Sequence, residues 1–193
     1  METIILASGS PRRRDLLGRV HIPVKVISPN VPEDYSGSAP ASEMVARIAL
    51  SKVEAVLELF KTESPRWVLG VDTVVVVDGN ILGKPQDAAA AEVMLGRLSG
   101  KVHEVYSGLA LLVRRGIAVE QQTVRTEVKF REMTASEMRY YVDTGDWVGA
   151  AGGYRIQERG GFFVEWIRGS YSNVVGLPIE AFYGILVRNG FQF

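Results

Sequence analysis

Apolar residues occur in short runs along this chain, and several runs have the length and composition of β-strands. The segment 67–77, "WVLGVDTVVVV", is too apolar for a strand that faces solvent, so we expect it to be buried. A tight turn follows at 78–80. The predicted strands are 3–8, 22–28, 67–77, a short return strand that starts at Ile81, 103–113 and 117–133, the last two joined by a turn at Arg115-Gly116.

Segments with helical spacing alternate with these strands. The segment 42–60 has an apolar stripe formed by Met44, Val45, Ile48, Val56 and Leu59. The other helices have start signals: Ser10 before Pro11, Asp87 as an N-cap with Gly100 after the helix, Thr134 with Glu137 as a capping box in a helix that ends at Gly145, and Pro178. The segment 149–178 is rich in glycine and has short strands. This alternation predicts an α/β fold with a mixed twisted sheet flanked by helices.

Composition limits the function classes. The 193 residues suit a single domain over 1–193, and 22 basic against 22 acidic residues give no overall attraction for nucleic acid. There is no cysteine and there are only two histidines, so a zinc site or a thiolate nucleophile is not expected. No secretory signal and no membrane-spanning run are apparent, and we expect a cytoplasmic protein.

Three consecutive arginines, Arg12 to Arg14, lie in the first turn of a predicted helix, where the helix dipole disfavours cations. An anion such as phosphate would explain them, because free backbone N–H groups and guanidinium groups would bind it together. Successive helical residues point about 100° apart, so at most two of the three can face one site. The alternative is a solvated helix turn whose arginines pair with distant carboxylates.

Two other charged residues lie at apolar positions. Asp72 interrupts the buried strand, where an ionised carboxylate needs a metal, a cation or hydrogen bonds. Lys52 lies on the apolar stripe of its helix, and either extends to solvent or points inward. Lys84, in "LGKP", lacks the glycine spacing of a P-loop, and no Rossmann glycine pattern occurs. Together with Glu33 and Asp34, these cations and carboxylates suit phosphoryl chemistry with a divalent cation.

Five segments, in this order, resemble the Maf family of nucleotide pyrophosphatases, also called septum-formation-inhibitor-like proteins. They are "LASGSPRRRDLL" (6–17), "VLGVDTVVV" (68–76), "LGKP" (82–85), "AGGYRIQERGGFFV" (151–164) and "GSYSNVVGLP" (169–178). The resemblance implies an elongated, two-lobed α/β domain with a central cleft, similar to inosine triphosphate pyrophosphatases. It also implies hydrolysis of the α–β phosphoanhydride of nucleoside triphosphates, which gives the monophosphate and pyrophosphate. Mg²⁺ or Mn²⁺, a homodimer and a house-cleaning role on excess or non-standard nucleotides are implied as well.

The resemblance also implies roles for individual residues. Asp72 matches the family's proton acceptor, and with Glu33 it is expected to hold the metal. Asp34 remains an alternative to Glu33 in the acidic position. The positions expected around the phosphates are Ser8, Arg12, Arg13, Lys52 and Lys84, the two lysines with catalytic roles.

Base preference divides the family, and Arg12, Thr73 and Gln157 match the branch that acts on dTTP and UTP. A glutamine amide offers one donor and one acceptor, which suits the O4 and N3–H edge of thymine or uracil. Gln157 bonded to the backbone of its own loop is the alternative. Many members of that branch have a lysine where this chain has Ala150. A different class of function, a non-catalytic nucleotide-sensing regulator of cell division, would predict nucleotide binding without turnover.

Overall fold

The computed structural model describes residues 2–60, 65–113 and 118–193, and it has the mixed α/β architecture that the sequence predicts. The strands are β1 (Ile4–Ala7), β2 (Val24–Val26), β3 (Trp67–Val77), β4 (Asn80–Leu82), β5 (Val102–Val113), β6 (Ala118–Phe130) and β7 (Val164–Arg168). The α-helices are α1 (Pro11–Arg19), α2 (Ala41–Leu57), α3 (Ala88–Leu98), α4 (Ala135–Asp143), α5 (Tyr171–Val175) and α6 (Ile179–Arg188), with short 3₁₀ turns η1 (Ala151–Gly153) and η2 (Arg159–Phe163).

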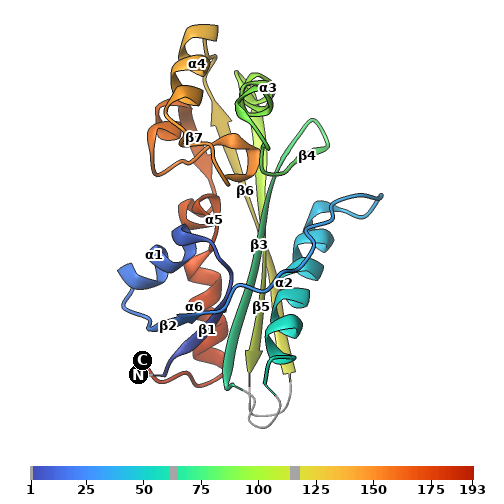
Figure 1. Ribbon diagram of the computed structural model, residues 1–193. Coiled ribbons are helices and arrows are strands. Elements are labelled where there is room, and N and C mark those ends of the chain that lie inside the picture. Colours follow the sequence, from blue (N-terminus) through green and yellow to red (C-terminus); the bar gives the residue numbers. More distant parts are fainter. Residues whose placement is uncertain (1, 61–64, 114–117) are drawn as a thin grey trace. The chain divides into compact units, whose positions relative to one another are not determined.

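The sheet has seven strands in the order β2-β1-β3-β5-β6-β7, and β4 pairs with β3 (Figure 1). It is mixed, as predicted. Strand β1 runs parallel to β2 and to β3, whereas β4 runs antiparallel to β3 and β7 runs antiparallel to β6. The chain divides into two compact units. The first comprises Met1–Asp72, Ser107–Val124 and Gly176–Phe193, and the second comprises Thr73–Tyr106 and Arg125–Val175.

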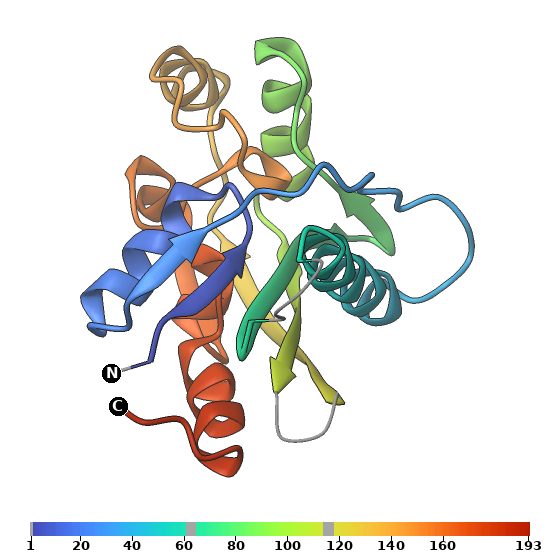
Figure 2. The same cartoon turned by 60° about the horizontal axis from the view of Figure 1, so that its bottom comes forward.

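In the first unit, successive residues of the central strands face opposite layers, as the pleat of a strand requires. Leu69 and Val71 of β3 pack in a cluster with Phe182 and Ile185 of α6. Val68 lies between Trp67 and Leu69 in β3 and packs in a different cluster, with Ala49, Val53 and Val56 of α2. Helices α2 and α6 therefore cover opposite faces of this part of the sheet, which Figure 2 also shows. Burial on both faces explains the nearly continuous apolar run in β3.

Two glycines allow α2 to approach the sheet closely. A Cβ atom on Gly70 of β3 would lie 2.1 Å from the carbonyl oxygen of Ala49. A Cβ atom on Gly108 of β5 would lie 2.4 Å from the carbonyl oxygen of Val45. Any larger residue at either position would push the helix away from the strands, so these contacts fix the place of α2 over β3 and β5.

The second unit has an aromatic core. The ring of Phe130 contacts those of His103, Tyr154 and Phe163 at centroid distances of 4.8–6.1 Å, and Phe163 in turn contacts Tyr141 at 5.5 Å. The hydroxyl of Tyr154 lies 2.8 Å from Nε2 of His103, and burial lowers the pKa of this histidine to about 4. His103 is therefore a neutral core residue at pH 7.

Most of the predicted elements are present, but β2 is shorter than the predicted 22–28 and β6 ends at Phe130 instead of 133. The segment 149–178, expected to have short strands, has β7 together with η1, η2 and α5. Thr134 and Glu137 form the capping box, and the Asp87 carboxylate accepts a hydrogen bond from the backbone N–H of Ala90. Ser10 occupies the N-cap position of α1, but its side chain makes no capping hydrogen bond there. The turn expected at Arg115-Gly116 lies outside the described residues.

The helix predicted over 42–60 was placed slightly too far along the chain. Helix α2 spans Ala41–Leu57, and Leu59 is exposed instead of continuing the apolar stripe. The helix ends before this residue, so helical spacing no longer determines where Leu59 points. Among the described residues, no helix has the length and apolar character needed to cross a bilayer.

We expect Gly70→Ala to destabilise the protein by about 1–3 kcal/mol, because the added methyl group overlaps the Ala49 carbonyl oxygen. For a chain of this size, this corresponds to a decrease in Tm of roughly 2–12 °C. Thermal unfolding followed by circular dichroism measures the change.

Gly96→Ala is the matched control. Gly96 lies on the exposed side of α3, and a Cβ atom there would have no heavy atom within 4 Å. The substitution should raise the stability by roughly 0.5–1 kcal/mol through helix propensity. Equal effects of the two substitutions would contradict the close packing of α2 on β3.

Candidate active site

Arg13 is the buried member of the arginine triplet, with 8% of its surface exposed. Its Nε donates to the carbonyl oxygen of Gly176 at 2.8 Å, and its Nη1 donates to Ser8 Oγ at 2.7 Å. Burial lowers the pKa of Arg13, whereas the negative charges of Asp72 and Glu33 raise it. The guanidinium group therefore lies within the electrostatic range of two carboxylates and is oriented by two hydrogen bonds.

The other two arginines of the triplet are more exposed than Arg13. Arg12 is half-buried, and Arg14 is exposed beside Asp15. Only Arg13 is buried, so the triplet is not one continuous cationic surface.

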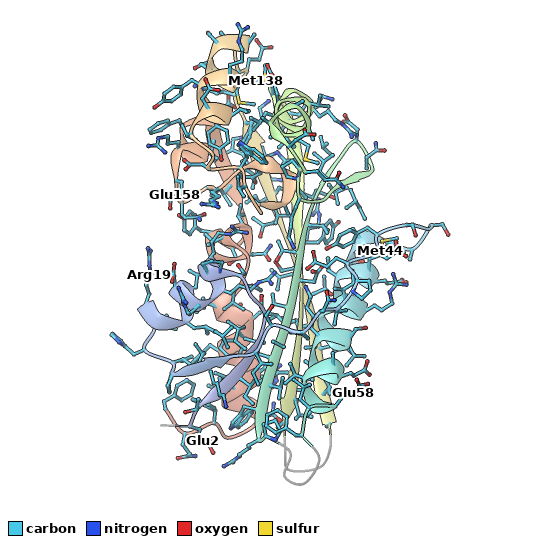
Figure 3. The ribbon with its side chains drawn as sticks, viewed as in Figure 1. Glu2, Arg19, Met44, Glu58, Met138 and Glu158 are labelled. Carbon is cyan, nitrogen blue, oxygen red and sulfur yellow. The ribbon has the colours of Figure 1, made fainter. Side chains whose placement is uncertain are left out.

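Lys52 points inward from α2 and has 6% of its surface exposed, which decides between the two alternatives for this residue. Figure 3 labels Met44, near the start of α2, and Glu58, just after its end, and Lys52 belongs to the helix between them in the sequence. Its Nζ donates to Glu33 Oε1 at 2.8 Å, to Asp72 Oδ1 at 2.8 Å and to the carbonyl oxygen of Val71 at 3.2 Å. These contacts use the three N–H donors of an ammonium group.

Asp72 is almost fully buried in β3, with 2% of its surface exposed. Lys52 binds its Oδ1, and the hydroxyl of Tyr35 donates to its Oδ2 at 2.8 Å. A cation and a hydrogen-bond donor thus replace the water that the carboxylate loses on burial. The charge in the middle of the apolar strand is compensated by groups from α2 and from the loop that precedes it.

The acidic loop, residues 31–36, directs its two carboxylates differently. Glu33 reaches Lys52, whereas Asp34 is exposed and its Oδ1 accepts the backbone N–H of Ser36 at 2.8 Å. The Ser36 side chain, and after it this backbone hydrogen bond, lowers the pKa of Asp34. Glu33 and Tyr35, on either side of Asp34, contact Lys52 and Asp72 respectively. Of the two alternatives for the acidic position, the structure brings Glu33 to the cluster.

Tyr35 is the member of this cluster that the sequence analysis missed. Burial raises the pKa of its hydroxyl, and the charges of Asp72 and Glu33 raise it further, so the group remains a protonated donor. The signal in the sequence was its position two residues after Glu33, in a loop that supplies a site residue. We call Glu33, Tyr35, Lys52 and Asp72, with Ser8 and Arg13, the Asp72 cluster.

The remaining predicted site residues belong to the second unit, which is described by itself. Thr73 is half-buried in β3, Lys84 is exposed after β4, and Gln157 is half-buried after η1. The backbone N–H of Gly152 donates to the carbonyl oxygen of Gly83 at 2.9 Å. The "LGKP" segment that carries Lys84 therefore contacts the "AGGYRIQ" segment that carries Gln157.

The side-chain oxygen of Gln157 is a buried acceptor, and no described residue donates a hydrogen bond to it. A buried amide oxygen without a donor is unfavourable unless another group supplies one. Ala150 is buried.

The donor set of the Asp72 cluster fits a hard divalent cation that also binds phosphate. Mg²⁺ prefers oxygen ligands and is often bound by one or two carboxylates together with substrate phosphates and water. Glu33 and Asp72 supply two carboxylates on either side of one ammonium group. Among the described residues there is no group of three or more His, Asp or Glu side chains suited to a metal ion.

A family model and curated relatives match nearly the whole chain. The family model described as "Maf-like protein" matches residues 3–189. A protein of Bacillus cytotoxicus named "dTTP/UTP pyrophosphatase" is 45% identical over 193 residues, which cover 100% of this chain and 96% of the relative. A protein of Symbiobacterium thermophilum with the same name is 43% identical, over 99% of this chain and 96% of the relative. Among solved structures, the Staphylococcus aureus Ham1 protein matches with a TM-score of 0.45 and 15% identity, over 67% of this chain and 72% of that one.

We expect Lys52→Met to destabilise the protein by about 3–5 kcal/mol, because it leaves the buried Asp72 carboxylate without its cation. Adding Asp72→Asn to this variant should restore part of the loss, since the buried charge is then removed as well. Urea unfolding measures both effects.

Lys101→Met provides the control, because Lys101 also pairs with an aspartate, Asp78, but at an exposed position. Its cost should stay below about 1 kcal/mol. If Lys52→Met were as mild as Lys101→Met, Lys52 would not be the buried partner of Asp72.

Proposed function

The chain belongs to the family of Maf-like proteins, and we propose that it is a nucleoside triphosphate pyrophosphatase that hydrolyses dTTP and UTP to the monophosphate and pyrophosphate. The observation that carries the proposal is the Asp72 cluster, in which a buried carboxylate, a second carboxylate and two cations surround one position of β3. Relatives that match this chain over nearly its full length are named for this activity. The proposal treats residues 1–193 as one catalytic domain.

The reaction needs a general base and positive charge near the phosphates. Asp72 accepts a proton from a water molecule, whose oxygen then forms a bond to the α-phosphorus. The bond from the α-phosphorus to the bridging oxygen breaks, and pyrophosphate leaves with the electron pair of that bond. Arg13 is held in one orientation by Ser8 and Gly176, so it can bind phosphate oxygens without losing much conformational freedom.

Glu33 and Asp72 are the residues that would hold Mg²⁺ or Mn²⁺. When bound, such a cation neutralises the charge of the phosphate oxygens. Lys52 already donates to three protein acceptors, so we assign it a positioning role toward Glu33 and Asp72. This refines the role at the phosphates that the family resemblance implies for it.

Arg12 and Lys84 keep the phosphate-binding roles implied by the resemblance, the latter as a catalytic lysine. Thr73 and Gln157 keep their roles in recognising the base. The side-chain oxygen of Gln157 is buried and accepts no hydrogen bond from a described residue, which supports its role in base recognition. The N3–H group of thymine or uracil would supply the missing donor. A homodimer, a cytoplasmic location and a house-cleaning role are further parts of this proposal.

Asp72→Asn should lower the rate of pyrophosphate release from dTTP and UTP by about 10²–10⁴-fold, since an amide cannot accept the proton of water. A coupled phosphate assay with Mg²⁺ or Mn²⁺ measures the rate. Asp78→Asn, which changes an exposed aspartate in the same way, should keep the wild-type rate. Unchanged turnover in Asp72→Asn would defeat the assignment of the base. Nucleotide binding by a wild-type protein that shows no turnover would favour the non-catalytic regulator instead.

Gln157→Leu should reduce the preference for UTP over CTP by at least about tenfold, because the variant can neither donate to O4 nor accept from N3–H. The ratio of the kcat/KM values for the two nucleotides is the measurement. Gln121→Leu, at an exposed position of β6, serves as the control and should leave the ratio unchanged. A preference that survives Gln157→Leu would transfer base recognition to other residues.

A further inference from the structure

The two oxygens of Asp72 are held by donors from different parts of the chain. Lys52 of α2 donates to Oδ1, and Tyr35 of the acidic loop donates to Oδ2, both at 2.8 Å. A carboxylate held at one oxygen can still rotate about its Cβ–Cγ bond, whose preferences are broad. A second donor on the other oxygen restricts that rotation. The plane of the Asp72 carboxylate therefore depends on both donors.

The surroundings of Tyr35 place its hydroxyl among the charged groups of the cluster. Asp72, Glu33 and Arg13 all act electrostatically on this hydroxyl, and its side chain is half-buried. Phenylalanine at this position keeps the aromatic ring and removes only the hydroxyl that donates to Asp72. Removing only the hydroxyl is therefore a clean test of the hydrogen bond.

The acidic loop is attached by other contacts that do not involve Tyr35. Glu33 binds Lys52, the carbonyl oxygen of Asp34 accepts from Arg47 Nη2 at 3.3 Å, and the Asp34 side chain closes a turn with Ser36. These contacts remain when the hydroxyl of Tyr35 is lost. The position of the loop should then be kept while Asp72 loses one of its two donors.

We propose that Tyr35 is a positioning residue for the hydrolysis: its hydroxyl fixes the plane of the Asp72 carboxylate, so that the second lone pair of each oxygen has a defined direction. The inference rests on the proposed function, in which Asp72 must direct a lone pair at the attacking water. Lys52 and Tyr35 then have one shared task, and each holds one oxygen of the base.

The test is Tyr35→Phe, assayed with UTP and Mg²⁺. We expect kcat to fall by about 10–100-fold, the range seen when a hydrogen-bond partner of a site carboxylate is removed. KM should stay within about twofold of wild type, because the hydroxyl acts on Asp72 and not on the nucleotide. Tyr106→Phe is the matched control: Tyr106 also donates to a carboxylate oxygen, of Glu104 at 3.0 Å, outside the Asp72 cluster. This variant should keep wild-type kcat and KM.

An unchanged kcat in Tyr35→Phe would overturn the proposal. So would a decrease in KM with kcat unchanged or raised, since the hydroxyl would then compete with the substrate for Asp72. If Tyr35→Phe lowered kcat only to the extent that it unfolds the protein at the assay temperature, the proposal would also be overturned, because the role of Tyr35 would be structural.

A crystal structure of Tyr35→Phe gives a readout that does not depend on turnover. The proposal expects the Asp72 carboxylate to adopt more than one orientation, with Lys52 still bound to Glu33. A single, unchanged orientation would overturn the inference. If the wild-type protein hydrolyses no nucleoside triphosphate, the proposed function fails, and this structure still tests whether Tyr35 orients Asp72.

Discussion

An ionised carboxylate inside a sheet costs several kcal/mol unless cations and hydrogen-bond donors replace its lost water. Asp72 meets this requirement through Lys52 and Tyr35, which reach it from α2 and from the loop before that helix. The charge of Lys52 is in turn shared with Glu33. Asp72 thus orients Lys52 and Tyr35, and replacing Lys52 by an apolar residue would leave the buried Asp72 carboxylate without its cation.

This arrangement depends on how closely α2 approaches the sheet. Lys52 can reach both Asp72 and the backbone carbonyl of Val71 because glycine at position 70 leaves no Cβ between the helix and β3. The same helix covers one face of the sheet while α6 covers the other. The packing of the apolar core and the geometry of the polar cluster are therefore determined by the same helix–strand contacts.

The predictions from sequence were most reliable where local chemistry decides the outcome. The capping box of Thr134 and Glu137, the N-cap of Asp87 and the buried character of β3 all follow from residues close together in the chain. The predicted end of α2 was wrong, because Leu59 continues the apolar spacing although the helix has ended. Periodicity cannot by itself locate the last turn of a helix, since end residues make few intrahelical hydrogen bonds.

For the candidate site, the sequence determined the family and drew attention to Asp72 and Lys52, because charged residues at apolar positions need compensation. Which partner compensates each charge was decided only by the tertiary structure. The choice of Glu33 over Asp34, the role of Tyr35 and the hydrogen bond from Arg13 to Gly176, 163 positions away in the chain, all depend on side-chain directions and on contacts between distant segments. Sequence records which groups are present, whereas the energy of a buried charge depends on distances of a few ångströms, which only the folded chain sets.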